Sequence, residues 1–133
     1  MTNLAALILV AVSAAPAKPH RVVVELNSPG KTAYNTVLGN LENLAKAFKP
    51  DPVEIEVVCH GDGIGLLAKT SGFEARMKKL TRQGVQFAAC NNTIKGRHID
   101  LNRLDPFIRV VPSGVAEVVK KEEAGWSYLK GGF

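Results

Sequence analysis

The chain has 133 residues and a formal net charge of +5 at pH 7, with 46% hydrophobic and 22% charged residues. This length suits one domain that buries a core without disulfide or metal staples, and the composition excludes a disordered tail. Lysines and arginines are spread along the chain instead of forming a basic stripe with interleaved aromatic residues, which argues against nucleic acid as a partner.

The first segment differs from the rest of the chain. Residues 4–12 are continuously apolar, Ala15-Pro16-Ala17 resembles a cleavage site, and polar residues begin at Lys18. The pattern predicts a secretory signal over residues 1–17 and one domain over residues 18–133, although no Lys or Arg precedes the apolar run. That run is too short for a stable membrane-spanning helix. We expect an exported or periplasmic protein if the signal is cleaved. A retained segment would leave the protein cytoplasmic and pack as an extra helix or an oligomer contact.

Strands and helices then alternate. A β-branched run over residues 21–26 predicts a strand, and apolar residues at helical spacing predict a helix that ends before Pro50. A second strand is expected over residues 53–59. The glycine-rich segment 61–65 predicts a tight turn, since it lacks the third glycine of a dinucleotide-binding fingerprint and the Gly-Lys-Ser/Thr of a phosphate loop.

The second half repeats this alternation. After a helix with Phe73, Met77 and Leu80 on one face, a buried strand over residues 85–89 leads into Cys90. The connection over residues 92–105 gives no clear pattern. A strand over residues 107–112 precedes a helix over residues 114–123, in which Val115, Val118 and Val119 are expected to face inward. The final strand covers residues 126–129, where Trp126 and Tyr128 are expected to serve core or oligomer packing. These elements predict a three-layer α/β/α domain with a mainly parallel sheet.

Cys90 is the strongest candidate for chemistry. It ends a strand and precedes Asn91-Asn92-Thr93, residue types that cap helices. A thiol at such a junction meets unpaired backbone N–H groups and the positive end of a helix dipole, and both favour the thiolate. The alternative is a small buried core residue. The basic run of Lys95, Arg97 and His98 could also lower the pKa of the thiol, or could be a solvated loop.

Four ordered segments resemble a known family. They are Val57-Val58-Cys59-His60-Gly61, residues 84–93, residues 110–117 and residues 125–130. Together they resemble the DsrE/DsrF-like family over about residues 21–130. The resemblance implies a five-stranded DsrE-type α/β fold and assembly into homo- or hetero-oligomers. It also implies a cysteine, which maps onto Cys90, that carries sulfane sulfur as a persulfide.

The residues around Cys90 have chemical and structural interpretations. Asn91, Asn92 and Thr93 could donate hydrogen bonds to a thiolate or persulfide, or simply cap a helix. Cys59 could resolve a persulfide on Cys90 or form a disulfide with it, if their strands are adjacent, or it could be core packing. His60 could act as a base toward either thiol, or be a hydrogen-bonded structural residue.

Two hypotheses of function remain. The first is a sulfurtransferase or persulfide carrier that uses Cys90 and has sulfur donor and acceptor proteins as partners. The alternative is a non-enzymatic α/β homo-oligomer that binds a small anion or a partner protein at the edge formed by Cys59, His60 and Cys90. These three residues and His98 are types that bind zinc, but their spacing matches no paired zinc motif, so no metal or other cofactor is expected.

Overall fold

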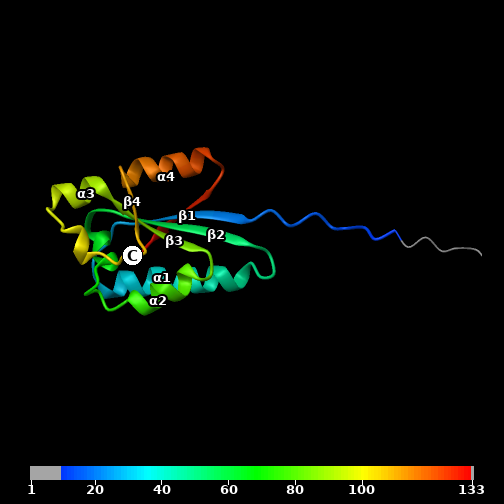
Figure 1. Cartoon of the computed structure of the whole chain (residues 1–133), viewed down its shortest axis with the longest axis horizontal. Helices are drawn as coiled ribbons and strands as arrows, with labels where there is room; N and C mark the ends of the chain where they lie inside the picture. Colours follow the sequence, from blue (N-terminus) through cyan, green and yellow to red (C-terminus); the bar gives the residue numbers. More distant parts are fainter. Residues whose placement is uncertain (1–9, 133) are drawn as a thin grey trace, which may run out of the picture.

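The computed structural model describes residues 10–132 of the chain. Residues 1–9 of the predicted signal lie outside the described residues. Residues 10–19 are exposed and form no helix or strand, and they extend away from the domain (Figure 1). Between residues 10 and 132, no helix has the length and apolar character needed to cross a membrane.

Five parallel strands form one sheet in the order β4-β3-β2-β1-β5. The sheet confirms the predicted α/β fold class. Its carboxyl ends meet at one edge, because Leu26 pairs with both Cys59 and Gly131, and Cys59 pairs with Ala89. The strands are β1 (His20–Leu26), β2 (Val53–Cys59), β3 (Val85–Cys90), β4 (Arg109–Val111) and β5 (Ser127–Gly131).

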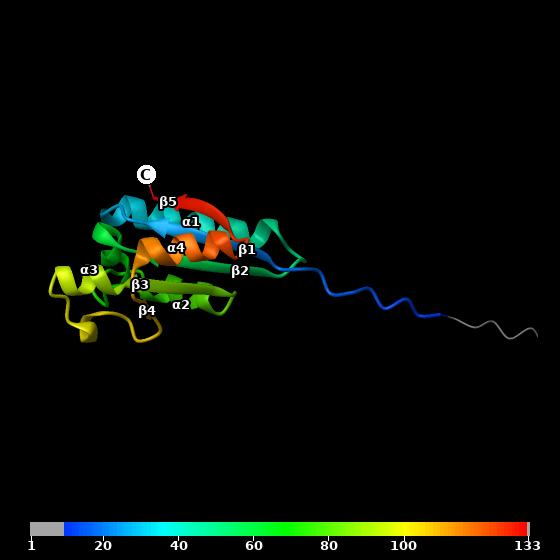
Figure 2. The same ribbon diagram turned by 90° about the horizontal axis from the view of Figure 1, so that it is seen from above.

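Helices cover both faces of the sheet (Figures 1 and 2). Helices α1 (Gly30–Ala47) and α2 (Glu74–Thr81) lie on one face, and α4 (Gly114–Glu123) lies on the other. Short helices follow or precede strands near the carboxyl edge: η1 (Gly61–Leu67), α3 (Asn91–Gly96) and η2 (Leu101–Arg103). Helix α4 runs back over the sheet and brings the chain to β5 beside β1.

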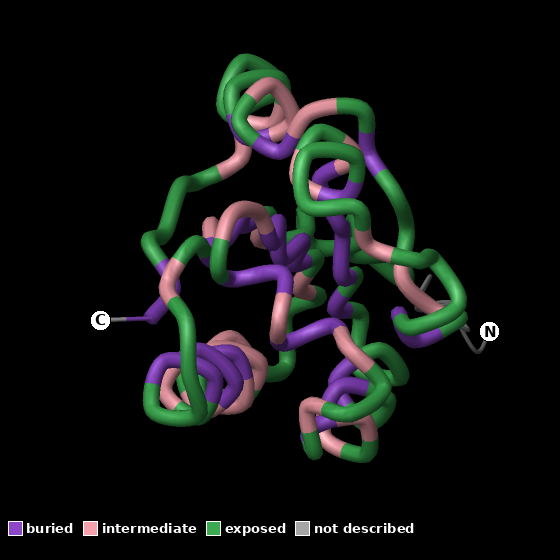
Figure 3. Tube along the Cα trace, turned by 90° about the vertical axis from the view of Figure 1, so that its left-hand side faces the viewer, coloured by how far each residue is buried: buried purple, intermediate pink, exposed green. Residues whose placement is uncertain are grey.

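The sheet separates two hydrophobic clusters. Alternation along each strand sends neighbouring side chains to opposite faces, and Figure 3 shows the buried residues along the strands and the inward sides of the helices. The larger cluster lies toward α1 and α2 and includes Val57, Cys59 and Ala89. The smaller cluster lies toward α4 and consists of Val23, Val58, Ala88, Val111 and Val118, with Trp126 packed against it.

Three segments differ from the sequence predictions. The glycine-rich segment is not a tight turn but the start of η1, and a Cβ on Gly63 would lie 2.1 Å from the Leu26 carbonyl oxygen, so only glycine lets η1 approach β1 this closely. Strand β4 is shorter than expected because residues 105–108 form a turn, in which the Ile108 N–H donates to the Asp105 carbonyl at 3.2 Å. The unassigned connection over residues 92–105 contains most of α3 and all of η2.

Helix α4 is rotated relative to the prediction. Val118 is buried as expected, but Val115 and Val119 are 58% and 51% exposed, so their inward placement was wrong. Glu56 of β2 is fully buried, and its Oε2 lies 2.7 Å from Lys121 Nζ. An ion pair beneath the helix therefore helps to decide which face turns toward the sheet.

Candidate functional site

Four polar side chains form a row across the α4 face of the sheet at its carboxyl edge. They are Cys90 at the end of β3, His60 just after β2, Glu25 in β1 and Tyr128 in β5, and these strands are consecutive neighbours in the sheet. Strand alternation places all four on the face of the smaller hydrophobic cluster. The row contains two predicted site residues, Cys90 and His60, and two that the sequence analysis did not assign to the site.

Cys90 and His60 lie side by side under the first residue of α4. The last register pair between their strands is Cys59 with Ala89, so the residues that follow, His60 and Cys90, are level. A Cβ on Gly114 would lie 3.1 Å from the Cβ atoms of both. The two Cβ atoms are therefore no farther apart than twice this distance. Glycine at the start of α4 allows the helix to approach both residues.

Hydrogen-bond donors converge on the Cys90 sulfur. Burial raises the pKa of the thiol, but donation by the Gly114 N–H, the Thr93 hydroxyl and the N–H groups of Thr93 and Asn92 outweighs burial and lowers the pKa overall. Thr93 Oγ1 accepts the Gly61 N–H at 3.0 Å, which leaves the hydroxyl hydrogen free to point at the sulfur. Cys90 is only 5% exposed. The sulfur thus lies in a nearly closed site in which an anion is stabilised.

The segment after Cys90 contributes mainly through its backbone. Asn92 offers its N–H while its side chain is exposed, and Thr93 offers both its N–H and its hydroxyl. Asn91 begins α3, and it is not among the groups that lower the pKa of Cys90. Donation to the sulfur therefore depends on how the chain turns from β3 into α3.

The basic run lies apart from the thiol. The groups that lower the pKa of Cys90 most are neutral hydrogen-bond donors, not the charges of Lys95, Arg97 and His98. The Arg97 Nη1 instead lies 2.7 Å from Asp62 Oδ1. Arg97 and His98 line a separate cavity of about 480 Å³. The pairing of Arg97 with Asp62 thus favours a solvated basic loop.

Cys59 points to the other face of the sheet. It belongs to the larger cluster beneath α1 and α2, is fully buried, and its burial raises the pKa of its thiol. Both Cys59 and Cys90 are free thiols. The structure brings the two cysteines to the same edge but not to the same face, which favours core packing for Cys59.

Glu25 connects His60 to Tyr128. Its Oε1 lies 2.7 Å from His60 Nε2, and its Oε2 accepts a hydrogen bond from the Tyr128 hydroxyl. Partial burial raises the pKa of Glu25, but these hydrogen bonds and the charges of His60 and Lys130 lower it overall. Bonding to Glu25 in turn raises the pKa of Tyr128 to about 12. In the sequence, Glu25 is an acid that directly follows three valines. It stands two residues after Val23, so strand alternation places both side chains on the same face of the sheet.

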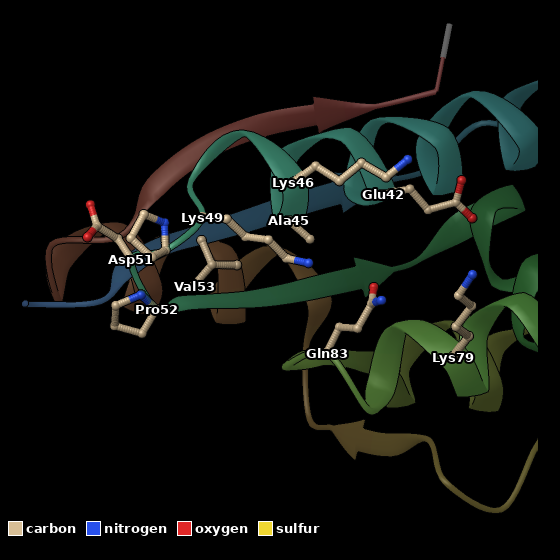
Figure 4. Close-up of a pocket in the computed structure, with 10 residues that line it drawn as sticks. Glu42, Ala45, Lys46, Lys49, Asp51, Pro52, Val53, Lys79 and Gln83 are labelled. Carbon is tan, nitrogen blue, oxygen red and sulfur yellow. The ribbon is translucent and has the colours of Figure 1, made fainter.

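Two larger cavities lie away from Cys90. One, of about 460 Å³, lies at the amino edge of the sheet, where Lys46 of α1, Lys49 in the turn after α1 and Lys79 of α2 line it (Figure 4). The other is the 480 Å³ cavity beside the basic run. Among residues 10–132, no group of three or more His, Cys, Asp and Glu side chains is placed to hold a metal ion. The Cys90 row is therefore the candidate site with the clearest chemistry.

Fold and site together define a small parallel-sheet α/β protein. At the carboxyl edge of its sheet, hydrogen-bond donors around the Cys90 thiol favour the thiolate. The pattern of the DsrE/DsrF-like family matches residues 20–130. The chain belongs to this family, as its sequence resemblance predicted.

Similar folds occur among solved structures. The protein of unknown function MTH1491 from Methanobacterium thermoautotrophicum is 32% identical over 84% of this chain and 98% of its own, with a TM-score of 0.79. The conserved protein of unknown function BT1422 from Bacteroides thetaiotaomicron is 14% identical over 82% and 92%, with a TM-score of 0.62. The ychN protein from E. coli is 14% identical over 84% and 98%, with a TM-score of 0.66. No curated protein gives a significant match.

Proposed function

We propose that this protein carries sulfane sulfur as a persulfide on Cys90, as a sulfurtransferase or persulfide carrier between a donor and an acceptor protein. The observation that supports this most strongly is the set of donors around the Cys90 sulfur, which lowers the pKa of the thiol despite its burial. A thiolate is the nucleophile in sulfur exchange. Membership of the DsrE/DsrF-like family agrees with this chemistry.

The proposed step conserves atoms and electrons. The Cys90 thiolate attacks the terminal sulfur of a donor persulfide and forms a new S–S bond, while the S–S bond of the donor breaks and its electron pair leaves with the donor thiolate. Nothing is oxidised or reduced overall. The same N–H and hydroxyl groups that stabilise the thiolate then lie beside the new persulfide anion. Because Cys90 is only 5% exposed, the donor sulfur must arrive on a small molecule or an extended segment.

Intact-mass analysis after incubation with a sulfane-sulfur donor tests the proposal. We expect the wild-type chain and Cys59→Ser to gain the mass of sulfur and Cys90→Ser to gain none. The Cys59→Ser variant is the matched control, because it removes the other thiol from the opposite face of the sheet. If donors that load a known carrier leave the wild-type mass unchanged, the sulfur-transfer function is wrong. The site would then fit a non-enzymatic module that binds a small anion or a partner protein.

We also propose that the chain forms homo-oligomers. Val115 and Val119 lie one helical turn apart on α4, and both are more than half exposed, so together they offer an apolar contact that a second copy of the chain would cover. Light scattering should give a mass that is a multiple of the 14.3 kDa chain, and Val119→Asp should lower it. A monomer at high concentration would contradict this proposal.

Export is proposed from the apolar segment at residues 4–12 and the small residues that follow. The mature protein of the native host should then begin at about residue 18. A mature protein that still begins at residue 1 or 2 would overturn export and place it in the cytoplasm.

A further inference from the structure

Three residues beyond Cys90, joined by two contacts, have no part in the sulfur-transfer step. Glu25 contacts His60 Nε2 at 2.7 Å through Oε1 and accepts the Tyr128 hydroxyl through Oε2. Together with Cys90 they extend across four neighbouring strands, from β3 to the edge strand β5. Glu25 and His60 are mostly covered, with side-chain exposures of 20% and 18%. Polar groups at this depth are held in one arrangement when their hydrogen bonds are satisfied.

The contact with Glu25 decides which nitrogen of His60 carries the proton. An ionised carboxylate only accepts hydrogen bonds, so His60 Nε2 must be the donor. In a neutral ring the free lone pair is therefore on Nδ1, the ring nitrogen on the Cβ side. The His60 Cβ lies 3.1 Å from the position of a Gly114 Cβ, as the Cys90 Cβ does. Nδ1 is bonded to Cγ, so the basic nitrogen lies at the Cβ end of the ring rather than at the end that contacts Glu25.

The Tyr128 hydroxyl holds the carboxylate in place. It donates to the oxygen of Glu25 that His60 does not use, so both carboxylate oxygens are occupied. Backbone pairing of β5 with β1 fixes the position of Tyr128 itself, at the level of Val23. The orientation of His60 therefore depends on residues from two other strands, Glu25 of β1 and Tyr128 of β5.

We propose that Glu25, held by Tyr128, is a positioning residue that keeps His60 in its Nε2–H form so that Nδ1 exchanges protons with Cys90 during sulfur transfer. This inference rests on the proposed function. Nδ1 takes the proton from the Cys90 thiol, which leaves the thiolate, and the Glu25 carboxylate stabilises the imidazolium that forms. After the donor S–S bond breaks, the imidazolium returns the proton to the departing donor thiolate, so His60 ends neutral. The arrangement is a Cys–His–Glu analogue of the triad used for nucleophile activation.

Substitutions at Glu25 separate positioning from packing. Glu25→Leu keeps the size of the side chain but removes both acceptors, whereas Glu25→Gln keeps an oxygen that accepts from Nε2–H and removes the charge. We expect Glu25→Leu to slow sulfur loading of Cys90 by about tenfold or more. Glu25→Gln should lie between Glu25→Leu and the wild type. Glu54→Leu is the matched control with no expected effect, because Glu54 is exposed on β2 away from the row.

Nitrogen-15 NMR of the imidazole rings gives a readout that lost packing alone would not move. The chain has three histidines, and comparison with His60→Asn identifies the His60 signals. The wild type and Glu25→Gln should show the Nε2–H form, and Glu25→Leu a mixture of both forms. Wild-type loading in Glu25→Leu, or an unchanged ring form, would overturn the positioning role. If Glu25→Leu does not fold, wild-type loading in His60→Asn overturns it instead, because the role of Glu25 acts through His60.

The readouts distinguish this inference from the proposed function. If the wild type takes up no sulfur, the persulfide function fails, and the rate at which iodoacetamide alkylates Cys90 replaces loading as the measure. Slower alkylation in Glu25→Leu than in Glu54→Leu would still support proton exchange with His60, and equal rates would overturn it. If the wild type loads and Glu25→Leu loads equally fast, the persulfide function stands and the positioning role fails.

Discussion

Gly114 contacts Cys90 so closely that a Cβ on the glycine would lie 3.1 Å from the Cys90 Cβ. The same position is 3.1 Å from the His60 Cβ and 3.3 Å from Val58 Cγ1. The contact lets the first turn of α4 offer its N–H to the sulfur. Ser113 caps this helix and accepts the Ala116 N–H at 3.4 Å, which fixes where the helix begins.

Gly114→Ala should move the start of α4 away from the thiol. The added methyl group meets three neighbours at once, so the Gly114 N–H donates less well and the pKa of Cys90 rises. Overpacking of this kind costs about 1–3 kcal/mol of stability. Alkylation rates as a function of pH and urea unfolding measure the two effects. Gly39→Ala is the control, since a Cβ there meets nothing within 4 Å; unchanged thiol reactivity in Gly114→Ala would contradict the prediction.

Thr93→Val should raise the pKa of Cys90 without changing side-chain volume. It removes the hydroxyl that accepts the Gly61 N–H at 3.0 Å and donates to the sulfur. A hydrogen bond to a charged group contributes about 1.5 kcal/mol, which corresponds to a rise of about one pH unit. Iodoacetamide alkylation followed across pH gives the value. Thr93→Ser keeps a hydroxyl and should stay close to the wild type, so equal shifts in both variants would argue against a role for the hydroxyl.

The two thiols should react differently in the native protein. Alkylation followed by peptide mass analysis should modify Cys90 first, because its pKa is lowered and a small part of the residue is exposed. Cys59 should react only at the rate of unfolding, because it is fully buried and its pKa is raised. Labelling of Cys59 before Cys90 in native buffer would contradict the placement of the two residues.

Cys59 should also weaken the fold at alkaline pH. Its folded pKa is raised, so the stability it contributes is present below the unfolded pKa near 8.5 and declines above it, where only the unfolded chain ionises. The slope approaches about 1.4 kcal/mol per pH unit. In a Cys90→Ser background, the stability cost of Cys59→Ala should therefore shrink between pH 8 and pH 10. A cost that is constant over this range, measured by urea unfolding, would rule out this contribution.

Glu56 should matter more to stability than an ordinary surface acid. It is fully buried beneath α4, with Arg109 Nη2 at 2.9 Å and Lys121 Nζ at 2.7 Å. Glu56→Gln removes the charge that both cations share and leaves them Glu117 alone. It should cost about 2–3 kcal/mol, below the usual range for a buried pair, because Arg109 and Lys121 keep this second partner and reach solvent. Glu42→Gln, which breaks a partly exposed pair with Arg76, should cost less than about 1 kcal/mol. Equal costs in urea unfolding would contradict the difference.

The sequence predicted the alternation of strands and helices because it is a local property of hydrophobic spacing. It predicted Cys90 at a strand end for the same reason. Strand order is not local, so the approach of Tyr128 to Glu25 could not be foreseen: β5 reaches β1 only because α4 crosses the sheet. The sequence placed Cys59 and Cys90 together because both lie at the carboxyl ends of their strands. Alternation within β2 and β3 separates them across the sheet.

The inward face of α4 shows a second limit of prediction from apolar spacing. Three valines predicted an apolar face, but only Val118 follows it. Glu56 of β2 received no prediction from the sequence, and it is buried and pairs with Lys121 of α4. A polar pair between distant segments outweighed the valine pattern, and single-sequence spacing gives no sign of such a pair.

The row that ends at Tyr128 draws its members from positions 25, 60, 90 and 128, which are spread over almost the whole described chain. No fragment that lacks the first or the last strand can assemble it. The chemical behaviour of one sulfur atom is therefore a probe of cooperative folding: a truncated or partly unfolded molecule keeps the cysteine but loses the surroundings that make it acidic.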